Sequence, residues 1–137
     1  MKYLVDANVL SEVTRPAPFP AVVEWLRKHE PDLVVTPIVL GEIEYGIGLT
    51  TSASKRKALQ RWFEEGLQRL RVLDLDPGTA SAWAALLIRL KKKGQAMPVK
   101  DSLIAASALQ HQLTIVTRNT GDFRNVGVPL LNPIEIR

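Results

Sequence analysis

Apolar residues in this chain follow two alternating patterns. Short runs of consecutive aliphatic residues predict β-strands at residues 2–5, 33–35, 72–75, 114–116 and 130–131. Between these runs, apolar residues recur at helical spacing, which predicts helices at residues 8–13, 22–29, 36–49, 54–70, 76–93 and from residue 101 onward. Strands that alternate with helices are typical of an α/β fold with a parallel sheet. No repeat or linker interrupts the pattern, so we expect one domain over residues 1–137.

The predicted helix at residues 36–49 carries an acidic residue beside its apolar face. Thr36 and Pro37 are a typical start, with Thr as the N-cap and Pro at the first helical position. One stripe along the helix consists of Leu40, Ile43 and Ile47, and the neighbouring stripe of Ile38, Glu42, Tyr45 and Leu49. Glu42 is therefore expected beside the buried face.

The later helices have apolar faces of their own, which we expect to build the core. Their inner residues are predicted to be Leu59, Trp62, Phe63, Leu67 and Leu70, then Ala80, Trp83, Ala84, Leu87 and Leu90, and finally Ile104, Ala105, Ala108 and Leu109. We interpret the three tryptophans, Trp25, Trp62 and Trp83, as core residues or as aromatic residues in a groove for a partner.

Composition narrows the class of protein. The chain has 137 residues, 46% of them hydrophobic and 23% charged, which is typical of a globular domain with a sizeable core. It contains no cysteine, which excludes disulfides, thiolate nucleophiles and zinc–thiolate or iron–sulfur sites and fits the reducing cytoplasm. Asp6 interrupts the first apolar run and no other run is long enough to cross a bilayer, so we expect no membrane segment. The formal net charge of +4 suits a polyanionic partner and is equally compatible with a simple solubility charge.

Four acidic residues stand at the edges of apolar segments. Asp6 ends the first predicted strand, Glu42 lies within PIVLGEIEYGI, Asp101 opens DSLIAASAL, and Asp122 follows the strand TIVT. Carboxylates beside a core are costly unless neutralised, and two charges about 4 Å apart repel by roughly 4 kcal/mol at an effective dielectric constant near 20. A hard cation with oxygen ligands would resolve this repulsion, which predicts Mg²⁺ or Mn²⁺ if the four acids converge.

Polar residues near these acids are candidates for supporting roles. Asn8 follows Asp6 closely and is expected to orient it, and Thr117 and Asn119 lie in the loop after a predicted strand, where ligand crevices of parallel sheets form. Arg118 in the same loop is the first choice for a contact with RNA phosphates. Lys91 to Lys93 are a second basic group, although lysines that close a helix also interact favourably with its dipole.

Each acid also has a purely structural interpretation. Asp6 is a suitable cap for the short helix that follows it, and Asp101 is suitable as an N-cap or as an acid in the first helical turn. Glu42 is compatible with a partly exposed position, and Asp122 with ordinary turn chemistry. The metal-site hypothesis therefore depends on the four being brought together.

In this order and with these flanking residues, the motifs resemble those of the PIN-domain ribonucleases, specifically the VapC-type toxins of bacterial toxin–antitoxin pairs. The resemblance covers essentially the whole chain and is carried by LVDANV, TPIVLGEIEYGI, KDSLIAASAL and LTIVTRNTGDF. The acidic pattern of the family falls on Asp6, Glu42, Asp101 and Asp122. Asn119 stands where some relatives carry another acid, so Asn119 and Asp122 are both candidates for serving a second ion.

The resemblance implies a three-layer α/β/α fold with a central, mainly parallel sheet, and an Mg²⁺- or Mn²⁺-dependent endoribonuclease that acts as a toxin. In that chemistry a metal ion lowers the pKa of a bound water and holds the scissile phosphate. Asp6 and Asp101 are expected to bind the main ion, with Glu42 and Asp122 completing the site. The resemblance further implies a small antitoxin protein that wraps the toxin, and a homodimer.

Two other functions are compatible with parts of the pattern. An aspartate at the end of the first strand also begins the haloacid-dehalogenase phosphatases, where Asp6 would be a nucleophile and Lys100 and Asp101 later motif residues. Asn8 argues against this, because that chemistry needs a second acid at this position. The other alternative is a PIN-like domain that binds RNA without cleaving it, against which the presence of all four acids argues.

Overall fold

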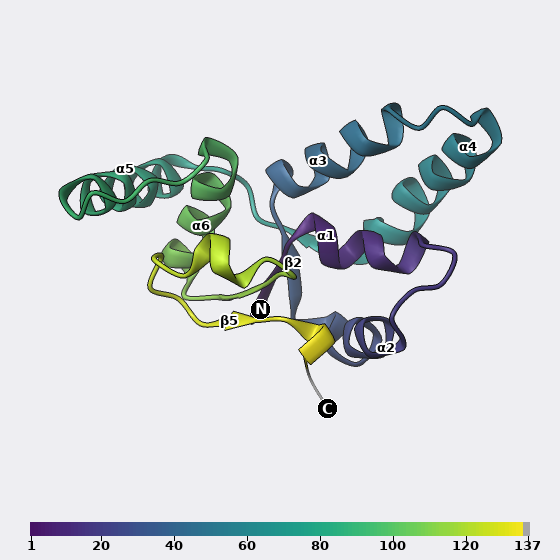
Figure 1. Cartoon of the computed structure of the whole chain (residues 1–137), viewed down its shortest axis with the longest axis horizontal. Helices are drawn as coiled ribbons and strands as arrows, with labels where there is room; N and C mark the ends of the chain where they lie inside the picture. The colour runs from purple at the N-terminus through teal and green to yellow at the C-terminus, as the bar shows by residue number, and fades with distance from the viewer. Residues whose placement is uncertain (136–137) are drawn as a thin grey trace.

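The computed structural model describes residues 1–135 and has a five-stranded sheet at its centre, in the order β3-β2-β1-β4-β5 (Figure 1). The strands are β1 (Tyr3–Val5), β2 (Leu33–Val35), β3 (Arg71–Val72), β4 (Thr114–Val116) and β5 (Leu130–Leu131). All neighbouring strands run parallel, which confirms the predicted parallel sheet. The last two residues of the predicted 1–137 domain lie outside the described residues.

Helices connect the strands. They are α1 (Ala7–Leu10), α2 (Pro20–His29), α3 (Pro37–Gly48), α4 (Ala53–Arg61), α5 (Pro77–Lys92) and α6 (Val99–His111). Short 3₁₀ segments occur at Ser11–Thr14, Glu30–Asp32, Leu67–Arg69, Thr120–Phe123 and Pro133–Glu135, and a π-helical segment at Trp62–Gly66. None of the helices within residues 1–135 is long and apolar enough to span a membrane.

Helical layers cover the sheet on both faces. In the interior strand β2, Leu33, Val34 and Val35 are each at most 4% exposed. Because successive side chains of a strand point to opposite faces, a strand that is buried at every position has packing partners on both sides. Ile115 and Val116 of β4 are fully buried in the same way. The predicted three-layer α/β/α architecture is thus confirmed.

Some local predictions need correction. The single helix predicted at residues 54–70 is α4 followed by the π-helical and 3₁₀ segments, and the strand predicted at 72–75 is the two-residue β3. On α5 the predicted inner residues Ala80 and Ala84 are exposed. Thr79 is buried instead, because its hydroxyl forms a capping box with Asp76 and donates to Gln110 at 2.6 Å.

The carboxyl ends of the parallel strands lie along one edge of the sheet, which includes the point where the strand order reverses. From β1 the chain moves outward through β2 and β3, and it then returns to build β4 and β5 on the other side of β1. The carboxyl ends of β1 and β4 are therefore neighbours at a topological switch point. In open α/β sheets such a point forms the ligand crevice, and the predicted site residues follow these strands.

Candidate functional site

Asp6 lies at the carboxyl end of β1, directly beside the end of β4. Val5 pairs with Val116 in the sheet, and the Asp6 backbone N–H donates to the Val116 carbonyl oxygen at 2.9 Å. Asp6 and Thr117, which directly follow these two strands, are therefore held side by side. The Thr117 hydroxyl donates to Asp6 Oδ2 at 2.9 Å. Asp6 Oδ1 accepts the Ala7 N–H at 2.8 Å. Asp6 is thus the cap of α1 and also a carboxylate that is only 7% exposed.

Asn8 connects Asp6 with the loop after β4. Its Nδ2 lies 3.4 Å from both Asp6 Oδ2 and Thr117 Oγ1, and its Oδ1 accepts the Arg118 backbone N–H at 3.2 Å. The Asn119 backbone N–H donates to Thr117 Oγ1 at 3.1 Å, while its side chain is exposed. The structure therefore brings Asn8 and Thr117 against Asp6, as expected for orienting residues, whereas Asn119 contributes its backbone.

Glu42 reaches the same crevice from α3. The helix starts at the buried Thr36, which follows β2 and whose hydroxyl accepts the Val39 N–H at 3.3 Å. Glu42 is 22% exposed, and its Oε2 lies 3.1 Å from Lys100 Nζ. Its Oε1 is buried and has no hydrogen-bond partner among the described residues. Because buried carboxylate oxygens are normally paired, this atom marks a place where a further donor belongs.

Asp101 and Asp122 complete the acidic group. α6 begins at Val99 with Pro98 as its N-cap, so Asp101 stands in the first turn, which was one of the two predicted positions. There its negative charge is favoured by the helix dipole. Asp122 is exposed within the 3₁₀ segment after β4, where its backbone N–H donates to the Asn119 carbonyl oxygen at 3.0 Å.

The four acids are coupled electrostatically. Burial raises the pKa of Asp6, Glu42 and Asp101 above the usual carboxyl range. Repulsion adds to this effect, since Asp122 raises the pKa of Asp6 and Asp101, and Asp6 raises the pKa of Glu42 and Asp101. Lys100 opposes these shifts in all three, and Glu42 in turn raises the Lys100 pKa through their hydrogen bond. Sequence reasoning had considered Lys100 only in the phosphatase alternative and gave it no role in the metal site.

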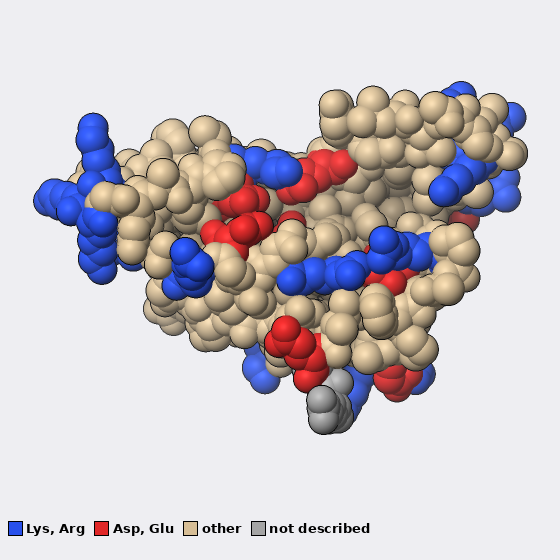
Figure 2. Space-filling view, in the orientation of Figure 1, with Lys and Arg blue, Asp and Glu red and all other residues tan. Residues whose placement is uncertain are grey.

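The donor set fits a hard divalent cation. The Lys100 ammonium group pairs with Glu42 and also interacts with Asp6 and Asp101, and Glu42 Oε1 lacks a hydrogen-bond partner among the described residues. Within residues 1–135, no three acidic or histidine side chains already converge closely enough to hold one ion together. A hard cation that keeps several waters needs only one or two direct carboxylates, so a looser ring of acids suits it. In Figure 2, acidic side chains gather in a hollow at the middle of the face, with basic groups around it.

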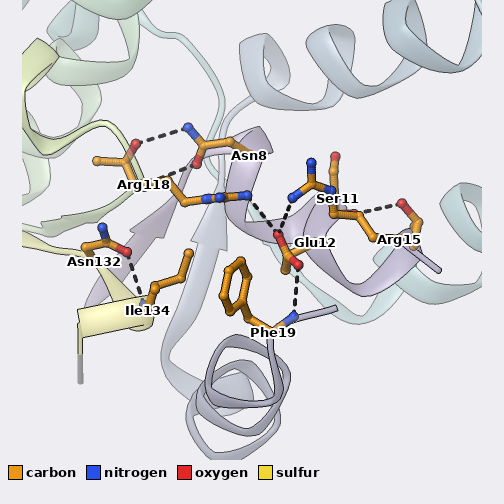
Figure 3. Close-up of polar contacts among 10 residues, drawn as sticks. Asn8, Ser11, Glu12, Arg15, Phe19, Arg118, Asn132 and Ile134 are labelled. Carbon is orange, nitrogen blue, oxygen red and sulfur yellow. Dashed lines mark hydrogen bonds and ion pairs between the residues drawn. The ribbon is translucent and has the colours of Figure 1, made fainter. Parts of the chain in front are cut away.

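A second polar cluster is centred on Glu12 (Figure 3), and Arg118 links it to Asn8 of the acidic site. Glu12 is 1% exposed, and its Oε1 accepts Arg118 Nη1 at 2.8 Å and Arg15 Nη1 at 3.3 Å. Its Oε2 accepts the Phe19 backbone N–H at 3.0 Å. The Arg118 guanidinium also lies 5.7 Å from the centre of the Phe19 ring, which suits a cation–π contact.

The position of Arg118 modifies its predicted role. Its side chain is 31% exposed and its Nη1 is paired with Glu12, so a phosphate contact would have to use its other N–H groups. Glu12 itself was not among the predicted site residues. Glu12 could have been recognised in the sequence as an acidic residue between the apolar residues Leu10 and Val13, one helical turn beyond Asn8. That position points into the core beside the site.

Comparison with known proteins agrees with the geometry. Residues 3–129 match the PIN domain family. The chain is 34% identical over 134 residues to Toxin FitB of Neisseria gonorrhoeae, covering 95% of this chain and 96% of that protein. It is 30% identical over 136 residues to VapC ribonuclease Y4jK of Sinorhizobium fredii, covering 96% and 97%. The crystal structure of FitAcB from Neisseria gonorrhoeae superposes with a TM-score of 0.91 at 33% identity, over 98% of this chain and 99% of that one. The chain belongs to the PIN domain family.

Proposed function

We propose that this protein is a divalent-metal-dependent endoribonuclease that acts as the toxin of a toxin–antitoxin pair. The proposal is supported by the electrostatic coupling of Asp6, Glu42, Asp101 and Asp122 beside the switch point of the sheet, and by Glu42 Oε1, which is buried without a hydrogen-bond partner within residues 1–135. The chain's relatives include proteins named as a toxin and as a VapC ribonuclease. Their full-length coverage supports transfer of the whole activity.

The ion in this proposal is Mg²⁺ or Mn²⁺. Asp6 and Asp101 would hold it, and Glu42 and Asp122 would complete or orient the site, directly or through water. When bound, it lowers the pKa of a water molecule and neutralises charge on the scissile phosphodiester. Oxygen is the sole donor type that these four side chains offer, which favours this class of metal over softer ones.

The protein groups have separate tasks in this proposal. Thr117 and the Ala7 N–H fix the two Asp6 oxygens, so that its carboxylate is held in one orientation. Lys100 fixes Glu42 Oε2 and leaves Oε1 free. Because burial raises the Glu42 pKa, its Oε1 is suited to accept a proton from the attacking water.

Basic side chains supply the attraction for RNA. The chain carries 18 basic and 14 acidic residues, and Figure 2 shows basic groups at both ends of the face that holds the acidic hollow. Arg118 Nη1 is engaged by Glu12, so we assign Arg118 a phosphate contact through its other N–H groups. Arg118→Ala should then weaken RNA binding and reduce its salt dependence.

The proposal includes the assembly and its location. We expect the whole chain to be one nuclease domain in the cytoplasm, forming a homodimer and inhibited by a cognate antitoxin protein. The relative FitB is named as a toxin, and its fold is nearly superposable on this one over the whole chain. Co-expression of a neighbouring antitoxin gene product, followed by size-exclusion chromatography with light scattering, measures both associations.

Cleavage of pooled cellular RNA by the purified, antitoxin-free protein tests the activity. We expect discrete cuts with Mg²⁺ or Mn²⁺ and none with chelator. Asp6→Asn and Asp101→Asn should abolish cutting while the circular dichroism spectrum stays unchanged. Glu42→Gln should lower it strongly, whereas its matched control Glu44→Gln, on the exposed side of the same helix, should not.

Contrary outcomes separate the alternatives. Full activity in both Asp6→Asn and Asp101→Asn would refute the site. If folded wild-type protein cuts no RNA with either metal, turnover of p-nitrophenyl phosphate would favour the phosphatase. Metal-independent RNA binding without cleavage would instead favour a binding domain. The side chain of Asn8 already argues against the phosphatase, since it is held by Asp6 and Arg118 and is no acid.

A further inference from the structure

A pocket of about 280 Å³ opens directly beside Glu42. It lies between the first helical segments after β1 and the paired helices α3 and α4, and Figure 2 shows the face hollowed beneath the lobe that those helices form. Ala7 and Asn8, the two residues after Asp6, belong to its wall, so it is continuous with the acidic site. The proposed nuclease chemistry assigns no role to this space.

The pocket has an apolar floor and a polar edge. Ile43, Ile47, Leu59 and Trp62 provide the apolar surface, and Asn8, Ser11 and Thr14 line the opposite side. The Thr14 hydroxyl donates to the Ser11 carbonyl oxygen at 2.7 Å, which leaves the Thr14 oxygen free to accept. The Ser11 hydroxyl has no hydrogen-bond partner within residues 1–135. The hydroxyl groups of Ser11 and Thr14 can therefore still form hydrogen bonds with a ligand that rests on the apolar floor of the pocket.

An aromatic ring stands at one side of this space. Trp62 is half-buried and begins the π-helical segment Trp62–Gly66. Such segments are rare and occur frequently at functional sites. An aromatic side chain beside polar groups is a combination that recognises unstacked bases in single-stranded RNA.

We propose that this pocket binds one unpaired nucleobase next to the scissile phosphate of a single-stranded RNA segment. This rests on the proposed nuclease function, since the pocket shares Glu42 with the acidic site. Its volume of about 280 Å³ is slightly below the range of small-molecule pockets, about 300–1,000 Å³, which suits a single base. An aliphatic side chain of a protein partner would fill the apolar floor but leave the hydroxyls of Ser11 and Thr14 unpaired.

Gly46 offers a way to fill the pocket without disturbing the core. It lines the pocket from α3, and no atom outside its own helix backbone lies within 4 Å of the position that a Cβ would take. A leucine at this position would point back over the preceding turn, toward Glu42 and Ile43. Replacing a mid-helix glycine also removes a destabilisation of about 0.5–1 kcal/mol, so Gly46→Leu is expected to fold.

Gly48 is the matched control on the same helix. It has equally open space around its Cβ position and does not line the pocket. A leucine there would point back over Glu44 and Tyr45, both exposed. Gly48→Leu therefore adds the same side chain outside the proposed subsite.

The experiment uses short RNA oligonucleotides that contain a cut site mapped with pooled RNA. In one series, each nucleotide beside the cut is replaced in turn by an abasic one. For the wild type, one such replacement should lower kcat/KM by a factor between about 5 and 100, the range expected for loss of one stacked base. On the intact oligonucleotide, Gly46→Leu should show the same decrease in kcat/KM relative to the wild type. Its kcat/KM should not decrease further when the abasic oligonucleotide is used. Gly48→Leu should behave like the wild type.

Binding of the same oligonucleotides is measured by fluorescence anisotropy in chelator, so the outcome does not depend on cleavage. If the wild type binds with the predicted abasic sensitivity and does not cut, the pocket is supported and the nuclease function fails. Full abasic sensitivity in Gly46→Leu, or insensitivity of the wild type at every position, would overturn the pocket proposal. In that case, loss of antitoxin inhibition in Gly46→Leu would assign the pocket to a protein side chain. If Gly46→Leu does not fold, Gly46→Val is used in its place.

Discussion

Replacing Glu12 with glutamine tests the polar cluster that Arg118 links to the acidic site. The carboxylate is 1% exposed and accepts hydrogen bonds from two guanidinium groups and from the Phe19 backbone N–H. Glutamine has nearly the same shape but carries no charge, and its amide nitrogen is a donor where the cluster needs an acceptor. At least one of the three bonds must therefore be lost.

The size of the effect follows from the burial of each partner. Breaking a fully buried ion pair typically costs about 3–5 kcal/mol, because a charge stays behind unpaired. Here the remaining cations reach water, since Arg118 is 31% and Arg15 is 56% exposed. The expected loss of unfolding free energy is therefore about 2–3 kcal/mol, close to one charged hydrogen bond. At about 3 °C per kcal/mol, Tm should fall by roughly 6–9 °C.

Urea unfolding, followed by far-UV circular dichroism, measures this difference as a shift of the midpoint at constant m-value. Glu24→Gln is the matched control, because Glu24 pairs with Arg27 three residues away and both are mostly exposed, at 62% and 74%. That change should leave the unfolding free energy nearly unchanged, because exposed ion pairs contribute little. If both variants lose the same free energy, the Glu12 cluster does not stabilise the fold in the way its burial implies.

The remaining predictions concern the acidic site without metal. Asp101→Asn should raise Tm in chelator, because the replaced carboxyl has a raised pKa and is repelled by Asp6, and an unchanged or lower Tm would contradict this. Because their pKa values are raised, Asp6, Glu42 and Asp101 keep protons in the native state at pH values where the unfolded chain has lost them. The unfolding free energy should therefore rise as pH falls from 7 toward the raised pKa values. Urea titrations at several pH values measure this change. Lys100→Met should tighten Mn²⁺ binding about tenfold by calorimetry, the size of one competing ion pair, and should lower Tm in chelator. The exposed control Lys55→Met should change neither value.

The parts of the fold that were predicted correctly are those fixed by short stretches of sequence. Runs such as LVV at residues 33–35 form strands because they are buried on both faces, and Thr36-Pro37 starts a helix through its own cap. The four candidate acids could also be selected from the sequence, because each stands within or at the edge of an apolar segment, and their role remains a prediction. These signals need no knowledge of distant contacts.

The missing parts depend on contacts between distant residues. Glu12 and Arg118 are 106 positions apart, and Lys100 meets Glu42 only because α6 lies beside α3. Thr79 gave no apolar signal and is nevertheless buried, because Gln110 supplies its hydrogen bond. Pairing of polar groups across the fold decides such positions, and the periodicity of one segment does not contain that information.

The structure also distinguishes two residues that the sequence left equivalent. Asn119 and Asp122 are both exposed and belong to the same loop. Asp122 raises the pKa of both Asp6 and Asp101, so its charge acts on the centre of the cluster. Asn119 carries no charge, and its backbone N–H binds Thr117, which in turn holds Asp6. Asn119 thus helps to fix the position of the first carboxylate, while Asp122 adds to the negative potential that a cation would neutralise, and exchanging their roles would require the loop after β4 to be rebuilt.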